Sequence, residues 1–325
     1  MIRKALRTAV LLLATTLPAL PARAFIAYVS NERDNTISVV DLDQMKTVKT
    51  VPVGQRPRGI TMTPDGREIL LCASDDDIIQ IIDPKTLAIT GTLPSGPDPE
   101  TFVLHVSGNP LFVSNENDNM VTIIDVAKRQ MLAQISTGVE PEGMEVSPDG
   151  RTIVNTSETT NMAHFFDVAS QRMVASVLVD ARPRIAQYRH DGREVWVSAE
   201  LGGTVSVIDP TRHAVTHRIA FTVPGLRAEA IQPVGLRFAP DDSLAFVALG
   251  PANRVAVVDT GSYEVKKYLL VGQRVWQMAF TPDGKYLLTT NGLSNDISVI
   301  DVGALRVVKS IPVGRLPWGV VVAPQ

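Results

Sequence analysis

The sequence predicts an all-β protein, a seven-bladed β-propeller whose blades are four-stranded antiparallel sheets. A period of 42 residues recurs along the chain, and each period contains four short runs rich in Val and Ile. Periods of about 40–45 residues with several strands each are typical of propeller blades. The chain also begins and ends within a blade, which predicts that its two ends pair and close the ring.

An aspartate stands at the end of one apolar run in every period. Successive copies are separated by 42 residues, with one interval of 50, and they lie at Asp41, Asp83, Asp125, Asp167, Asp209, Asp259 and Asp301. Seven copies predict seven blades. An Asp side chain accepts hydrogen bonds from the backbone of the turn that follows it, so we interpret this column as structural rather than catalytic.

The first period illustrates the four strands of a blade. Its apolar runs cover residues 25–30, 36–40, 47–53 and 59–63. These lengths, and the dominance of Val and Ile, are typical of strands and not of helices. The fourth run ends at Pro64-Asp65-Gly66, where Pro presets φ and Gly accepts the positive φ that a tight turn requires.

The two ends of the chain carry complementary parts of one blade. The run at residues 25–30 has the pattern of a second blade strand, and the run at residues 319–324 has the pattern of an innermost strand. We therefore expect the C-terminal strand to pair with the N-terminal blade. This pairing would close the ring and remove its free edges without a disulfide.

Residues 1–24 have the pattern of a secretory signal peptide. Basic residues precede a short apolar stretch at residues 9–20, and residues 22–24 form an A-x-A cleavage site. The apolar stretch is too short to span a bilayer. We expect a periplasmic protein without a membrane span, in which residues 25–325 form the propeller.

The charge balance excludes some classes of partner. The signal peptide holds four basic residues and no acid, so its removal would lower the formal net charge from −3 to −7. A chain this acidic is a poor candidate for binding nucleic acid or anionic lipid. The single cysteine, Cys72, lies in an apolar run and is expected to be a buried, inert thiol.

Several segments resemble the YVTN-type β-propeller repeat. They are Tyr28-Val29-Ser30-Asn31, residues 35–41, Val53-Gly54, residues 57–60, and the later stretches 295–301 and 313–319. Within that family, a signal peptide followed by seven repeats is similar to the β-propeller proteins associated with PQQ-dependent alcohol catabolism. The resemblance implies a periplasmic accessory protein. Its partner would be a protein such as a quinoprotein dehydrogenase or its electron acceptor, or else a small ligand.

The position just before each innermost strand is the first candidate site. Loops of a propeller alternate between two faces, and this column lies on the top face, at the mouth of the central channel. Its seven residues are Arg58, Glu100, Glu142, Arg184, Val234, Trp276 and Trp318. We interpret the charged and aromatic members as a ligand-binding or partner-binding site. The alternative is that the charges neutralise one another while the tryptophans plug the channel.

A second top-face column is rich in acids. It contains Glu32, Glu116, Glu158 and Glu200, with Ser or Gly in the other three blades. Carboxylates on one rim repel each other unless they are solvated or hold a cation. We expect a solvated acidic rim used in partner recognition, and no metal. If a cation did bind, oxygen ligands would favour calcium.

The sequence favours a binding or scaffold module over an enzyme, and we assign no catalytic residue and no cofactor. Zinc-protease, serine-hydrolase and haem-attachment motifs are absent. The tryptophan-rich docking motifs of eight-bladed quinoprotein dehydrogenases are also absent, so we do not expect bound PQQ. Two alternatives remain. One is a lactonase-like hydrolase using Glu100 and Glu142, and the other is a non-catalytic propeller subunit of a periplasmic oxidoreductase.

The 50-residue interval marks an insertion at residues 222–231. Because this loop belongs to the top face, it is either a lid over the channel mouth or a tolerated insertion.

Overall fold

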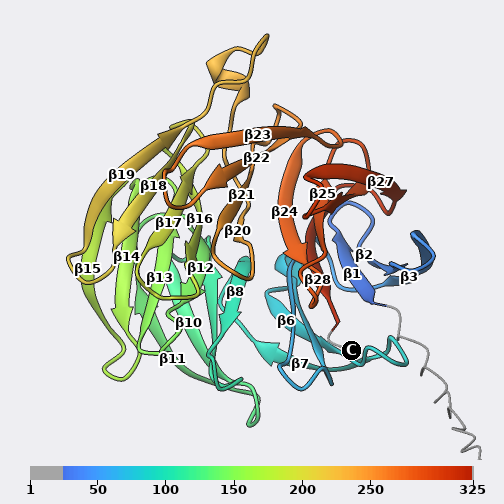
Figure 1. Cartoon of the computed structure of the whole chain (residues 1–325). Coiled ribbons are helices and arrows are strands. Elements are labelled where there is room, and N and C mark those ends of the chain that lie inside the picture. Colours follow the sequence, from blue (N-terminus) through green and yellow to red (C-terminus); the bar gives the residue numbers. More distant parts are fainter. Residues whose placement is uncertain (1–24, 324–325) are drawn as a thin grey trace, which may run out of the picture.

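The computed structural model describes residues 25–323 of the chain (Figure 1). Over these residues, 28 strands form seven four-stranded antiparallel sheets arranged as the blades of a propeller. The predicted fold class is therefore confirmed. The signal peptide prediction falls on residues 1–24, which lie outside the described residues. No helix in the described range is long and apolar enough to cross a membrane.

Each blade has four strands, ordered from the channel outward. Blade 1 contains β28 (Pro317–Val322), β1 (Ile26–Asn31), β2 (Thr36–Asp41) and β3 (Lys46–Pro52). Blade 2 contains β4 (Pro57–Met62), β5 (Ile69–Ala73), β6 (Ile78–Ile82) and β7 (Ile89–Pro94). Blade 3 contains β8 (Pro99–Leu104), β9 (Leu111–Asn115), β10 (Met120–Asp125) and β11 (Gln130–Ser136). Blade 4 contains β12 (Pro141–Val146), β13 (Thr152–Ser157), β14 (Met162–Asp167) and β15 (Arg172–Leu178).

The remaining blades repeat the same order. Blade 5 contains β16 (Pro183–Tyr188), β17 (Val195–Ala199), β18 (Thr204–Asp209) and β19 (Ala214–Ala220). Blade 6 contains β20 (Leu236–Phe238), β21 (Leu244–Ala248), β22 (Arg254–Asp259) and β23 (Val265–Leu270). Blade 7 contains β24 (Val275–Phe280), β25 (Tyr286–Asn291), β26 (Asp296–Asp301) and β27 (Arg306–Pro312). Two short 3-10 helices, η1 (Ser74–Asp76) and η2 (Ala228–Ala230), lie in loops.

The ring closes as predicted. Strand β28 pairs antiparallel with β1, with Ala27 opposite Val322 and Val29 opposite Val320. In Figure 1 the blue start of the propeller therefore lies beside its red end. The pairing leaves β1 without a free inner edge.

The aspartate column caps its turns. Asp41 Oδ1 accepts hydrogen bonds from the backbone N–H groups of Asp43 and Gln44, both at 2.9 Å. The other six aspartates make the same kind of contact: Asp83, Asp125, Asp167, Asp209, Asp259 and Asp301. The Lys266 ammonium, together with hydrogen bonds from the turn, lowers the pKa of Asp259 to about 2. The column thus makes the contacts expected of turn-capping residues.

The core consists of side chains packed between successive blades. Trp196 of β17 is fully buried and packs edge-on against Phe238 of the next blade, with ring centroids 5.1 Å apart. Cys72 of β5 is also fully buried, and burial raises the pKa of its thiol well above its usual range. A thiol with so little thiolate is a poor nucleophile.

Side-chain oxygens of Asn and, in one case, Asp join neighbouring blades at the top face. Asn35 follows β1, and its Oδ1 accepts the backbone N–H of Arg56 at 3.0 Å, just before the inner strand of the next blade. Five other junctions repeat this bond: Asp77 to Asp98, Asn119 to Glu140, Asn161 to Arg182, Asn253 to Arg274, and Asn295 to Leu316. Each junction therefore fixes where an inner strand begins, and with it the side chains at the channel mouth.

The remaining junction carries the insertion at residues 222–231. Val223 and Ile231, at its two ends, are buried in the core shared by blades 5 and 6. Residues 224–229 between them are exposed. In Figure 1 this yellow-orange loop projects beyond the outline of the ring. The loop is therefore anchored to the core at both ends.

Candidate functional site

The structure brings the predicted channel-mouth residues together in ion pairs. Arg58, in β4, pairs with Glu100 of the neighbouring β8. The Arg58 guanidinium also lies over the indole of Trp318, 5.5 Å from the ring centroid. Three adjacent inner strands therefore place a cation between a carboxylate and an aromatic face, which is a favourable arrangement for a partly buried cation.

A second ion-pair group lies on the adjoining blades. Arg184 Nη2 is 2.9 Å from Glu142 Oε1, and Arg184 Nη1 pairs with Glu158. The same guanidinium lies 5.7 Å from the ring centroid of Trp276. Burial raises the pKa of both glutamates, and Arg184 opposes that rise.

Close packing of the inner strands holds these side chains in place. A Cβ at Gly143 would overlap the carbonyl oxygen of Arg184, so only glycine lets β12 and β16 approach this closely. The Thr156 hydroxyl donates to the same carbonyl at 2.8 Å. The backbone of Arg184 is therefore fixed from two sides.

Most of this column is inaccessible to solvent. Glu100 is 0% and Glu142 2% exposed, and Arg184 and Trp318 are also buried. The charges neutralise one another and the indole of Trp318 fills space, as the alternative interpretation of the column expects. The buried members are thus unavailable as a free acid–base pair, which removes the role that the hydrolase alternative gave to Glu100 and Glu142.

The acidic rim differs from the solvated rim that the sequence suggests. Glu158 and Glu200 are buried, and Arg182 lies 2.9 Å from the first carboxylate and 3.1 Å from the second. Glu32 is partly exposed and lies 3.5 Å from Arg58. Neutralisation by arginine is the physical reason that these carboxylates leave solvent.

Three arginines that the sequence analysis missed provide much of this neutralisation. Each stands two residues before a member of the channel column, and their intervals are multiples of 42 residues once the insertion is allowed for. They are Arg56, Arg182 and Arg274. Arg56 lies 3.2 Å from Glu100, and Arg274 lies 2.6 Å from Glu200. Arg274 also stacks over Trp276, 4.1 Å from the ring centroid. The repeat spacing was the signal that could have identified them.

Glu116 is the exception on the rim. Its side chain is half-buried, and within residues 25–323 no basic side chain lies within ion-pair distance of it. Burial raises the pKa of Glu116 to about 7, and the neighbouring Glu100 carboxyl adds to the rise. A carboxyl group that titrates near neutral pH is suited to accept and return a proton.

Two carboxylate trios on the top face have oxygen atoms within 4.8 Å of one another. They are Asp98, Glu100 and Glu116, and Glu116, Glu140 and Glu158. Oxygen donors at this spacing suit a hard cation such as calcium. Glu100 and Glu158 are already paired with arginines, so a cation would have to displace these pairs.

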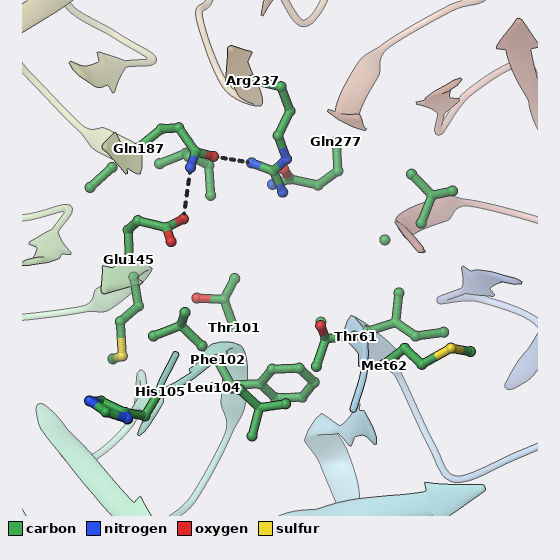
Figure 2. Close-up of a pocket in the computed structure, with 18 of the residues that line it drawn as sticks. Thr61, Met62, Thr101, Phe102, Leu104, His105, Glu145, Gln187, Arg237 and Gln277 are labelled. Atoms are coloured by element: carbon green, nitrogen blue, oxygen red, sulfur yellow. Dashed lines mark hydrogen bonds between the residues drawn. The ribbon is translucent and has the colours of Figure 1, made fainter. Parts of the chain in front are cut away.

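The channel below the mouth contains a cavity of about 440 Å³. It extends from Gly59 and Trp318 to the turns at Pro64 and Val106, so it reaches the face opposite the mouth. We call this part the lower channel (Figure 2).

Three polar side chains on successive inner strands line the lower channel. Gln187 Nε2 donates to Glu145 Oε2 at 3.0 Å, and Arg237 Nη1 donates to Gln187 Oε1 at 2.9 Å (Figure 2). Burial raises the pKa of Glu145 to about 7 and lowers the pKa of Arg237. These residues also share one repeat position, which the sequence analysis did not single out.

The sequence matches no protein-family model and no curated protein sequence. Many solved structures are similar in fold. The periplasmic gluconolactonase PpgL of Pseudomonas aeruginosa is 17% identical over 93% of this chain and 99% of its own, with a TM-score of 0.78. A Kuenenia stuttgartiensis hydrazine synthase chain is 19% identical over 83% of this chain and 95% of its own, with a TM-score of 0.73. Dihydro-heme d1 dehydrogenase NirN is 17% identical over 95% of this chain and 77% of its own, with a TM-score of 0.71. At these identities the comparisons show a shared β-propeller fold.

Proposed function

We propose that this protein is a lactonase-like hydrolase whose general base is Glu116 at the channel mouth. The observation that carries the proposal is a carboxyl group with a pKa of about 7 beside a cluster of arginine–glutamate pairs. Perturbed carboxyl groups in such surroundings are typical of catalytic sites. The gluconolactonase among the similar structures supports the same reaction class.

The chemistry requires one base and one electrophilic group. Ionised Glu116 takes a proton from water as the water oxygen attacks the lactone carbonyl. Arg58 is partly exposed and its charge acts on Glu116, so it is placed to stabilise the negative charge that develops on the carbonyl oxygen. The ring C–O bond then breaks, and the leaving oxygen takes the proton from Glu116. The product is a hydroxycarboxylic acid.

Purified protein incubated with gluconolactone tests this proposal. We expect turnover that rises with pH through about 7 and then levels off, because only ionised Glu116 acts as a base. Glu116→Gln should lower kcat by about 10²–10⁴-fold without changing the melting temperature. Glu229→Gln, in the exposed insertion, is the matched control and should behave as wild type. No turnover with gluconolactone, or unchanged turnover in Glu116→Gln, would refute the proposal.

A non-catalytic accessory role is the second candidate. The observation favouring it is the closure of the channel mouth by paired charges, which leaves Glu116 as the unpaired rim carboxylate among the described residues. In that case the top face binds a periplasmic protein linked to PQQ-dependent oxidation. Co-purification of a dehydrogenase with the protein from periplasmic extract, together with absent lactone turnover, would favour this candidate.

We also propose that the protein is exported. The basic and apolar pattern of residues 1–24 supports this location, as does the periplasmic gluconolactonase of similar fold. N-terminal sequencing of protein recovered from the periplasm should begin at Phe25. Recovery of the uncleaved chain from the cytoplasm would contradict export.

A further inference from the structure

The lower channel has the size and walls of a small-molecule site. Its volume of about 440 Å³ lies within the range of about 300–1,000 Å³ that is usual for ligand pockets. Phe102 and Leu104 of β8 and Met62 of β4 form an apolar side of the wall (Figure 2). Glu145 and Arg237 lie across the open space from them in the same view. The cavity therefore combines an apolar wall with a few converging polar groups.

Arg237 is a partly buried cation that has no carboxylate partner among the described residues. Its Nη1 donates to Gln187 at 2.9 Å and to the carbonyl oxygen of Leu236 at 2.7 Å. Within residues 25–323, no Asp or Glu oxygen lies within 4.0 Å of its guanidinium, in contrast to the arginines at the channel mouth. Nη2 and Nε make no hydrogen bond to the described residues. A guanidinium with two free donor nitrogens presents the fork that binds a carboxylate through two parallel hydrogen bonds.

Gln187 holds Glu145 apart from Arg237. The amide accepts from Arg237 with its oxygen and donates to Glu145 with its nitrogen, so the two charged groups are bridged and do not form a direct pair. The second oxygen of Glu145 makes no hydrogen bond to the described side chains. When protonated, Glu145 can donate to a ligand that occupies the cavity.

We propose that the lower channel binds a small monocarboxylate, with its carboxylate on Arg237 and its apolar body against Phe102 and Leu104. A cationic ligand would be repelled by the permanent positive charge of Arg237. A neutral ligand would leave that charge uncompensated. The site lies on the channel side away from Glu116, so the proposal does not depend on lactone hydrolysis.

Binding of the anion is coupled to a proton on Glu145. The groups nearest Glu145 on neighbouring elements are Arg237 of β20, Tyr188 of β16, and His190 in the turn after β16. His105 lines the same cavity, but its ring contacts Ser107 and the carbonyl oxygen of Gly150. A carboxylate on Arg237 adds negative charge to this cluster and so raises the pKa of Glu145 further above about 7. Glu145 therefore takes up a proton as the ligand binds near neutral pH.

Isothermal titration of the mature protein with benzoate tests the site. Benzamide is the neutral probe of the same shape, and benzylamine is the cationic one. We expect benzoate to bind at least about tenfold more tightly than either, because it alone supplies a counter-charge to Arg237. Equal binding of benzoate and benzamide, or no benzoate binding, would overturn the proposal.

Variants separate this site from the channel mouth. Arg237→Gln should weaken benzoate binding at least about tenfold, whereas Arg67→Gln, an exposed arginine at the same face, should bind as wild type. Glu116→Gln should also keep benzoate binding, even if it abolishes lactone turnover. Unweakened binding in Arg237→Gln would contradict the assignment.

The pH dependence gives a readout that does not require Arg237 to be changed. Benzoate is fully ionised from pH 6 to pH 9, so any change in its affinity over this range comes from the protein. Glu145 loses its proton as the pH rises above 7, and the affinity for benzoate should therefore fall by up to about tenfold per pH unit. Glu145→Gln should bind benzoate with an affinity that is flat over this range. A wild-type affinity for benzoate that does not change with pH would refute the coupling to Glu145. If Arg237→Gln fails to fold, the comparison of benzoate with benzamide on the wild-type protein still decides whether the site binds a carboxylate.

Discussion

The two ends of the channel use arginine in different ways. At the mouth, Arg184 lies between Glu142 and Glu158, and its charge is compensated within the protein. In the lower channel, Arg237 meets the amide of Gln187, which separates it from Glu145. Apart from Glu158, which follows β13, both sets lie on inner strands at fixed positions of the same repeat. The difference shows that one blade architecture can produce a filled ion-pair layer at one depth and a cavity with an uncompensated cation at another.

Removing Arg184 should produce the largest effect, because it breaks the ion-pair layer. Arg184→Met leaves Glu142 buried without its counter-charge and leaves Glu158 with Arg182 alone, and breaking a buried pair in this way costs about 3–5 kcal/mol. Urea unfolding measures the loss. Arg182→Gln is the matched comparison: its side chain is 44% exposed, and we expect a loss of about 0–1 kcal/mol. Equal, small losses in both variants would mean that the layer is not the stabilising end of the channel.

A change at Gly143 should have an intermediate effect. Gly143→Ala places a methyl group against the backbone carbonyl of Arg184 and forces β12 away from β16. Overpacking of this kind costs about 1–3 kcal/mol. Gly261→Ala, at a turn where the added carbon would meet Asp259 Oδ1 at an ordinary contact distance of 3.4 Å, serves as the control and should lower stability less. A Gly143→Ala protein as stable as the control would contradict the close strand approach.

The pH dependence of stability tests Glu145 itself. Its folded-state pKa of about 7 lies above the ordinary value of 4.5, so the stability that it contributes at low pH is lost as pH rises through about 7. The stability of Glu145→Gln relative to wild type should therefore increase between pH 4.5 and 7 and change little above that. Thermal unfolding of both proteins at several pH values measures the difference. A constant difference across this range would place the pKa of Glu145 near its ordinary value.

The sequence was sufficient to predict the fold because the fold depends on periodicity. The aspartate column determined the number of blades, and the incomplete blade at each terminus indicated the pairing of β28 with β1. The same spacing indicated that Arg58, Glu142 and Trp318 would converge. These predictions concern position along a repeat, which a periodic sequence specifies directly.

The pairing of side chains was not predictable in the same way. Long side chains reach between columns, so Arg182 neutralises Glu158 and Glu200 although neither belongs to its own repeat position. This is why an expected solvated rim is instead largely buried. The bridge between Glu145 and Arg237 depends on inter-strand distances that the repeat does not encode.

The most direct test of the contrast between the two ends is the titration of glutamate carboxyl carbons by NMR, in protein labelled at glutamate Cδ. We predict that Glu116 and Glu145, assigned from their Gln variants, both titrate near pH 7, and that benzoate raises the pKa of Glu145 alone. Titration of both groups near 4.5, or a benzoate effect at Glu116 instead of Glu145, would contradict the account.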